Sequence, residues 1–188
     1  EEGISCYAHT GAYAFPSPTL TNSIEKDIVF IEPIIGIKLA ISDHRSASIT
    51  KDELAKIASI GRVSGMIAKK SGHTTLHVGD GKKGLGLIYE VLSEFDISIT
   101  FFQPTHVNRN ERLFDQGKQF LKDGGYVDLT CYSQDRFTPL KAYKELTKDN
   151  IPLDKLTFSS DGYGSYSNYD KDGKLINMGV ATVKALYN

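Results

Sequence analysis

The sequence has almost no net charge, few cysteines and no long apolar run. Its formal net charge of -1 at pH 7 gives no electrostatic reason to expect nucleic acid or an anionic membrane as a partner. No stretch approaches the roughly 18 apolar residues that a membrane span needs, and no basic segment precedes an apolar one near the N-terminus. We therefore predict a cytoplasmic protein that binds neither nucleic acid nor membranes.

The two cysteines, Cys6 and Cys131, allow at most one disulfide. Both lie in apolar segments, so we expect reduced, buried packing residues, as is usual in the cytoplasm. A length of 188 residues suits one hydrophobic core, which predicts a single domain over residues 1–188. The chain starts without Met just before a strand-like segment and ends within a helix-like one, so we expect a piece of a longer protein.

Short apolar runs recur along the chain and favour strands that are buried on both faces, as in parallel sheets. They occupy residues 3–9, 35–42, 74–78, 97–105, 127–132 and 156–159. Helical patterns lie between them. One begins at Thr50 with a capping-box pattern to Glu53, and others cover residues 83–95, 110–122, which Gly124 would end, and 138–148, with Pro139 at a favourable first position.

Strand and helix alternate at about thirty residues, close to one unit of an eight-unit (β/α)₈ barrel. The fold class is therefore α/β with a parallel sheet. The alternation alone allows either a doubly wound open sheet or most of a TIM barrel.

Polar residues gather where the predicted strands end, which is where sites form in both of these folds. His77, His106 and Asp161 follow strand-like runs in this way, and Lys38 lies within another among aliphatic neighbours. If the strands are consecutive barrel strands, all four side chains point at one mouth. That arrangement favours the barrel.

These residue types suit a metal site. Imidazole and carboxylate are ligands for zinc and similar divalent ions. Burial would push Lys38 towards a neutral amine, which can take up carbon dioxide and become a carbamate that bridges two metals. Asp161 could shuttle a proton to and from water. Structural readings exist for each: a hydrogen-bonded histidine, a lysine that reaches for solvent, and a turn at Asp161-Gly162. Their succession at several strand ends favours a functional site.

The chain resembles the amidohydrolase superfamily and, within it, the isoaspartyl dipeptidases. The resembling motifs are Thr10-Gly11-Ala12-Tyr13, residues 36–46, His77-Val78-Gly79-Asp80, residues 104–110 and Ser159-Ser160-Asp161-Gly162. The resemblance implies a partial TIM barrel, at about its third to eighth strands. It also implies a zinc-dependent metallo-dipeptidase that hydrolyses β-aspartyl dipeptides by attack of water activated on the metal, and that is a homo-oligomer at full length.

The resemblance also implies roles for individual residues. Lys38 matches a carboxylated lysine that bridges two zinc ions, and His77 and His106 match ligands of one of them. Asp161 matches an aspartate that binds the other zinc and acts as general base and then acid. The remaining matches are to a tyrosine that stabilises the tetrahedral intermediate and to substrate-binding residues: Tyr13, Arg45, Arg109 and Ser165.

One motif of the family is absent. The family carries a His-x-His pair on its first strand, and this sequence contains none. We therefore expect one zinc ion or none in this chain, and weak or no peptidase activity.

Other readings remain open. The pattern G-x-G-x-x-G at residues 79–84 suggests a nucleotide-binding module, although the acidic residue expected after the next strand is missing. A non-catalytic α/β fragment is a second alternative. Among enzymes, a dihydroorotase-like or N-acyl amino acid deacetylase activity could use the same residues. Tyr163–Tyr169 reads as a mobile active-site loop or a surface loop, with a turn at residues 170–173, and His9 and His73 read as structural or solvated.

Overall fold

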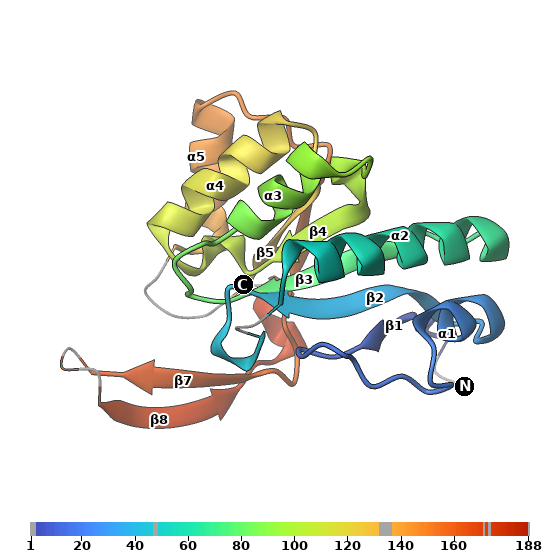
Figure 1. Ribbon diagram of the computed structural model, residues 1–188. Coiled ribbons are helices and arrows are strands. Elements are labelled where there is room, and N and C mark those ends of the chain that lie inside the picture. The colour runs from blue at the N-terminus through green and yellow to red at the C-terminus, as the bar shows by residue number, and fades with distance from the viewer. Residues whose placement is uncertain (1–2, 47–48, 132–136, 171, 173, 188) are drawn as a thin grey trace.

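The computed structural model describes residues 3–46, 49–131, 137–170, 172 and 174–187. Within them, parallel strands follow one another in chain order: β1 (Ala8–Gly11), β2 (Ile34–Ile41), β3 (His73–Val78), β4 (Phe102–Thr105), β5 (Val127–Thr130) and β6 (Leu156–Ser159). Strands β1 to β4 form one sheet in that order, and β5 pairs with β6. Strand β5 lies beside β4 (Figure 1). This spatial order confirms the predicted α/β fold and is consistent with part of a TIM barrel.

Helices cover one side of these strands. They are α1 (Ile24–Phe30), α2 (Lys51–Ala68), α3 (Gly86–Glu94), α4 (Glu111–Lys122) and α5 (Pro139–Lys148). Figure 1 shows α2 to α5 above the strands, on the side away from the C-terminal hairpin. No helix among the described residues is both long and apolar enough to cross a membrane.

The predicted caps explain where several helices begin. Thr50 and Glu53 form the expected capping box at the start of α2. The side chain of Asn110 accepts from the backbone of Leu113 at the start of α4, and Pro139 lies in the first turn of α5. Helix α3 begins at Gly86, later than the predicted residue 83, because hydrogen-bonded turns precede it.

Alternation along the strands separates the hydrophobic core from the polar interior. In β2, Ile37, Leu39 and Ile41 are fully buried in the hydrophobic core, and each such side chain contributes about 1.5–3 kcal/mol. Because side chains alternate, Lys38 faces the opposite side of the strand, away from that layer. The inner face of the sheet is therefore free to carry polar groups.

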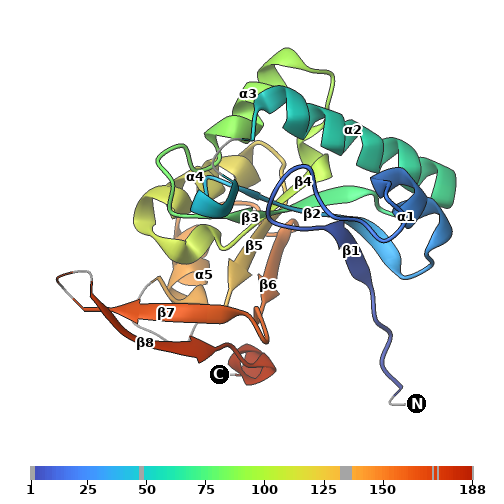
Figure 2. The same cartoon turned by 60° about the horizontal axis from the view of Figure 1, so that its bottom comes forward.

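The C-terminal region differs from the sequence prediction. Residues 163–169, predicted as a loop, contain strand β7 (Ser165–Tyr169), which pairs antiparallel with β8 (Leu175–Val180). Figure 2 shows this hairpin on the side of the strands opposite the helices. The predicted turn is supported by the Asp170 carboxylate, which accepts the backbone N–H groups of Asp172 and Lys174. The hairpin gives the tyrosine-rich segment a regular backbone.

Three further differences concern the N-terminal third of the chain. Helix α1 was not predicted. Strand β1 starts at Ala8, not at residue 3, because its partner β2 begins only at Ile34, opposite Ala8. Both cysteines are free, but Cys6 is exposed, so its predicted burial was wrong.

Candidate functional site

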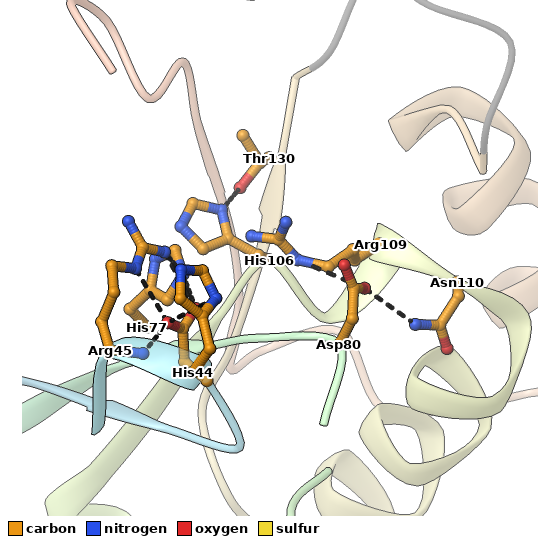
Figure 3. A network of polar contacts seen from close by, with 9 residues as sticks. His44, Arg45, His77, Asp80, His106, Arg109, Asn110 and Thr130 are labelled. Atoms are coloured by element: carbon orange, nitrogen blue, oxygen red, sulfur yellow. Dashed lines mark hydrogen bonds and ion pairs between the residues drawn. The ribbon is translucent and has the colours of Figure 1, made fainter. Parts of the chain in front are cut away.

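The strand ends bring most of the predicted site residues together. Arg45 follows β2, His77 lies near the end of β3, and His106 follows β4. Figure 3 shows Arg45 and His77 side by side with His106 next to them and the Arg109 guanidinium close by. The His77 and His106 rings meet edge to face, with centroids 4.5 Å apart. The fold thus brings these residues together at one end of the sheet.

A buried carboxylate, Asp43, links two of these residues. Arg45 donates to it from Nε and Nη2, both at 2.8 Å, and from its backbone N–H at 2.9 Å. The Asp43 Oδ2 atom also lies 3.1 Å from His77 Nε2. The side-chain hydrogen bonds from Arg45 hold the pKa of Asp43 well below its usual range, so it is ionised at neutral pH. A single anion thus orients both a guanidinium and an imidazole.

Both site histidines are neutral at pH 7. Burial lowers the pKa of His77 to about 4, and Arg109 and Arg45 act in the same direction. Burial lowers the pKa of His106 to about 2, helped by His77 and Arg109. A neutral imidazole keeps one nitrogen lone pair, which is the form that ligates metals.

Lys38 and Asp161 influence one another electrostatically. Burial lowers the pKa of Lys38, and Asp161 only partly offsets this effect. Burial raises the pKa of Asp161, and Lys38 and Arg109 oppose the shift. Burial thus disfavours the charged form of each group, while the opposite charge of the other group favours it.

Tyr13 lies over the basic groups. The Arg45 Cζ atom is 4.2 Å from the centroid of its ring and the Lys38 Nζ atom is 5.5 Å from it. The same ring stands edge to face with His77, with centroids 4.8 Å apart. Tyr13 is therefore part of the cluster, as the sequence suggested.

Two predicted substrate-binding residues are less closely held. Arg109 approaches the exposed carboxylate of Asp80 at 4.0 Å. Ser165 lies in the hairpin, opposite Val180 in β8, and is exposed. The contacts of the described residues do not join Ser165 to the cluster.

Three strand-end residues adopt the left-handed backbone conformation. Ser42, His106 and Asp161 have φ values of 51°, 68° and 48° and follow β2, β4 and β6. Such conformations cost free energy in residues other than glycine and concentrate at functional sites. The backbone therefore marks the same end of the sheet that the side chains do.

The histidines fit a metal in part. His77 Nδ1 is buried and has no hydrogen-bond partner among the described residues. His77 Nε2 lies 3.1 Å from Asp43 Oδ2 and 2.9 Å from Arg45 Nη2, and the guanidinium can only donate. Nδ1 carries the lone pair, as in the carboxylate-histidine-zinc arrangement, in the tautomer whose Nε2–H donates to Asp43, and it carries the hydrogen when Nε2 accepts from Arg45. His106 Nδ1 lies 2.6 Å from the Thr130 hydroxyl, which fixes its ring. However, within the described part of the chain, no group of three or more His, Cys, Asp or Glu side chains could hold an ion.

Sequence reasoning missed some polar residues at this end of the sheet. Asp43 was seen only as part of a motif. Asp128 in β5 is buried and accepts hydrogen bonds from Thr105 and Ser159, both at 2.6 Å, and from Thr157 at 2.9 Å. An aspartate inside an otherwise apolar run, Val127 to Leu129, is the signal that could have found it.

The glycine-rich motif has a packing role. The N–H of Gly79 donates to Ile41 and that of Gly81 donates to Ser42, at 3.1 and 2.7 Å. A Cβ on either glycine would lie 2.5 Å from the Ser42 carbonyl oxygen. Because these amides are used within the fold, they are not presented to a phosphate as a nucleotide-binding loop requires.

No family model matches the chain. Two solved structures of β-aspartyl dipeptidase from the thermophile Fervidobacterium islandicum AW-1 are similar to it. One, in complex with β-Asp-Leu dipeptide, has a TM-score of 0.91 and 40% identity over 99% of this chain and 49% of that chain. The other has a TM-score of 0.86 and 38% identity over 99% of this chain and 47% of that chain. The chain thus spans about half the length of these enzymes. Over that half it shares the fold of these two β-aspartyl dipeptidases and 38–40% of their residues, which confirms the family resemblance.

Proposed function

We propose that this chain carries a large part of the active site of a metal-dependent β-aspartyl dipeptidase. The observation that carries the proposal is the gathering of His77 and His106 beside Arg45 and Arg109 at the strand ends (Figure 3). Lys38, within β2, reaches the same cluster, with Nζ 5.5 Å from the centroid of the Tyr13 ring. It is supported by the 40% identity to a β-aspartyl dipeptidase that was solved with β-Asp-Leu.

In this proposal His77, His106, Lys38 and Asp161 hold zinc. His77 and His106 supply neutral imidazoles, and Asp43 and Thr130 orient the two rings. Lys38, made less basic by burial, is suited to carboxylation. Zinc, when bound, would polarise the amide carbonyl and lower the pKa of water. The donor set described by the structure is incomplete, so we expect at most one ion in this chain.

The other residues act on the substrate. Asp161, with a raised pKa, would take a proton from water and return it to the leaving amine. The Tyr13 hydroxyl would donate to the developing oxyanion.

Arg109 would bind a substrate carboxylate, because a planar guanidinium matches two oxygens. Arg45, whose Nε and Nη2 atoms already donate to Asp43, would bind the second carboxylate through its remaining N–H groups. Ser165 would contact the substrate only if the substrate approached from the side of the hairpin.

A different amide substrate is the nearest rival, since the same groups could serve a dihydroorotase-like or deacetylase reaction. Two arginines near one cluster favour a substrate with two carboxylates. A β-aspartyl dipeptide has these, one at each end.

Titration calorimetry with Zn²⁺ tests the metal half of the proposal. The unsubstituted chain, His77→Gln and His106→Gln would be compared. His44→Gln is the control, because His44 is 87% exposed and approaches the cluster through Nδ1, which lies 3.6 Å from Asp43 Oδ1. We expect both site variants to bind zinc more weakly and the control to bind as the unsubstituted chain does. Equal zinc affinity in all four proteins would refute these ligands.

Dipeptide binding tests the substrate half. With zinc present, β-Asp-Leu should bind more tightly than α-Asp-Leu, and Arg109→Met should remove the difference. Any hydrolysis of β-Asp-Leu should depend on zinc and be lost in Asp161→Asn. Binding of dihydroorotate or an N-acetyl amino acid in preference to β-Asp-Leu would move the assignment to those activities.

A further inference from the structure

Two histidines outside the candidate site meet on the inner face of the sheet. His9 in β1 and His73 in β3 both align with Gly36 in β2. By strand alternation His73 shares a face with His77, and Gly36 shares one with Lys38. The pair therefore lies one level further from the strand ends than Lys38, on the same face.

Gly36 makes this meeting possible. A Cβ at Gly36 would stand 3.0 Å from His9 Cδ2 and 3.2 Å from His73 Nδ1, and 2.6 Å from the His73 carbonyl oxygen. Any side chain on the middle strand would separate the two rings. The absence of one lets imidazoles from non-adjacent strands reach each other across β2.

The two rings approach each other through one nitrogen atom of each. His9 Nε2 and His73 Nε2 are 3.0 Å apart, and the ring planes are at 88°. With metal–nitrogen bonds of about 2.1 Å, adjacent ligands lie about 3.0 Å apart at a right angle and about 3.4 Å apart at the tetrahedral angle. The observed separation thus matches the right angle of tetragonal Cu²⁺ or Ni²⁺ better than tetrahedral zinc.

The surroundings favour metal-ligating rings. Ser71 Oγ lies 2.7 Å from His73 Nδ1, so an Nδ1–H that donates to it would leave the Nε2 lone pair for an ion. Burial lowers the pKa of His73, which keeps its ring neutral. Thr75 Oγ1 lies 3.4 Å from His9 Nε2 and adds an oxygen nearby. In this chain the residue His9 is exposed.

We propose that His9 and His73 form a second transition-metal site, separate from the strand-end cluster, that takes Cu²⁺ or Ni²⁺ as two adjacent nitrogen ligands. The remaining coordination positions hold water. Because the ligands come from β1 and β3, a bound ion clamps these strands across β2. The alternative is a direct hydrogen bond in which one ring donates and the other accepts.

Copper titration followed by NMR of the histidine ring protons distinguishes the two. The chain has five histidines, and assignment of their ring signals allows the strand-end cluster to be read separately from His9 and His73. At sub-stoichiometric Cu²⁺ we expect paramagnetic broadening of His9 and His73 together, while the exposed His44 stays sharp. Sharp His9 and His73 signals, or broadening of His44 first, would overturn the proposal.

Variants sharpen the result. His73→Gln should abolish the broadening at His9, and His44→Gln should leave it intact. Broadening of His9 that persists in His73→Gln would mean that the two rings do not share an ion. Circular dichroism checks that the variants fold, and if His73→Gln does not, the titration of the unsubstituted chain decides the question. Neither readout depends on catalytic activity, so the proposed dipeptidase function can fail without affecting it.

Discussion

The strand ends and the hairpin β7–β8 place their side chains in opposite ways. At the strand ends, charged or polar Asp43, His77 and His106 are buried. In the hairpin, apolar Ile176 and Met178 are 63% and 64% exposed. Buried polar groups and exposed large apolar groups are both departures from the usual pattern. Hydrogen bonds hold the buried polar groups in place at the candidate site. The apolar side chains of the hairpin lie largely in water in this chain.

The largest expected effect comes from the core that supports the strand ends. Phe102 in β4 is fully buried, so Phe102→Ala should lower the free energy of unfolding by about 3–5 kcal/mol. Phe30→Ala is the matched control, because Phe30 is 77% exposed and its loss should change stability by no more than about 0.5 kcal/mol. Urea denaturation measures both. Similar losses of stability in the two variants would mean that burial does not explain the cost of removing Phe102.

A smaller effect is expected where buried amide groups join β4 to β5. The Asn108 side chain donates to the carbonyl oxygens of Thr130 and Phe137, at 2.9 and 3.0 Å, and accepts from the Thr130 N–H at 2.9 Å. Asn108→Ala leaves these groups unpaired and should cost about 1–3 kcal/mol in urea denaturation. Gln119→Ala, at an exposed amide, serves as the control. Equal stabilities of the two variants would contradict the prediction.

Asp43→Asn tests whether a buried charge at the strand ends serves the proposed metal site. Removing the carboxylate frees His77 and Arg45, so zinc affinity should fall about 10–100-fold by titration calorimetry. Asp80→Asn changes the same residue type at the next strand end, but Asp80 is exposed, and among the described residues its carboxylate approaches Arg109 and Asn110. Its zinc affinity should not change. If both variants bind zinc equally well, Asp43 does not orient the ligand.

The smallest effect is expected in the hairpin. Ile176→Ser should change the free energy of unfolding by no more than about 0.5 kcal/mol, because the side chain is already largely in water. Thermal denaturation of the variant measures this. A clear loss of stability would show that the exposed apolar residues of β8 are covered by another surface in solution.

The sequence predicted the parallel strands and most helices because their signals are local. Continuous apolar runs and caps such as Thr50 depend only on neighbouring residues. Boundaries set by a partner strand were missed. Strand β4 starts at Phe102, not at residue 97, because it pairs from Thr74 onwards, and a 3-10 turn at Ile99–Phe101 precedes it.

Much of the candidate site was predictable for a similar reason. In a parallel sheet, residues after consecutive strands must meet, so His77 and His106 could be grouped without coordinates. The contacts of Asp43 with Arg45 and His77 could not be predicted in this way, because they depend on the direction of each side chain. The pairing of His9 with His73 was also beyond reach, since it depends on both aligning with Gly36.

The hydroxyl groups around Asp128 have a consequence for how β6 is placed. Thr157 and Ser159 are two residues apart, so both face the carboxylate in β5. If β6 slipped by one position against β5, both hydroxyls would turn to the outer side of the sheet and an ionisable group would remain buried with fewer donors. A shifted register of β6 therefore costs free energy. The hydrogen bonds to Asp128 favour the register of the strand that leads to Asp161.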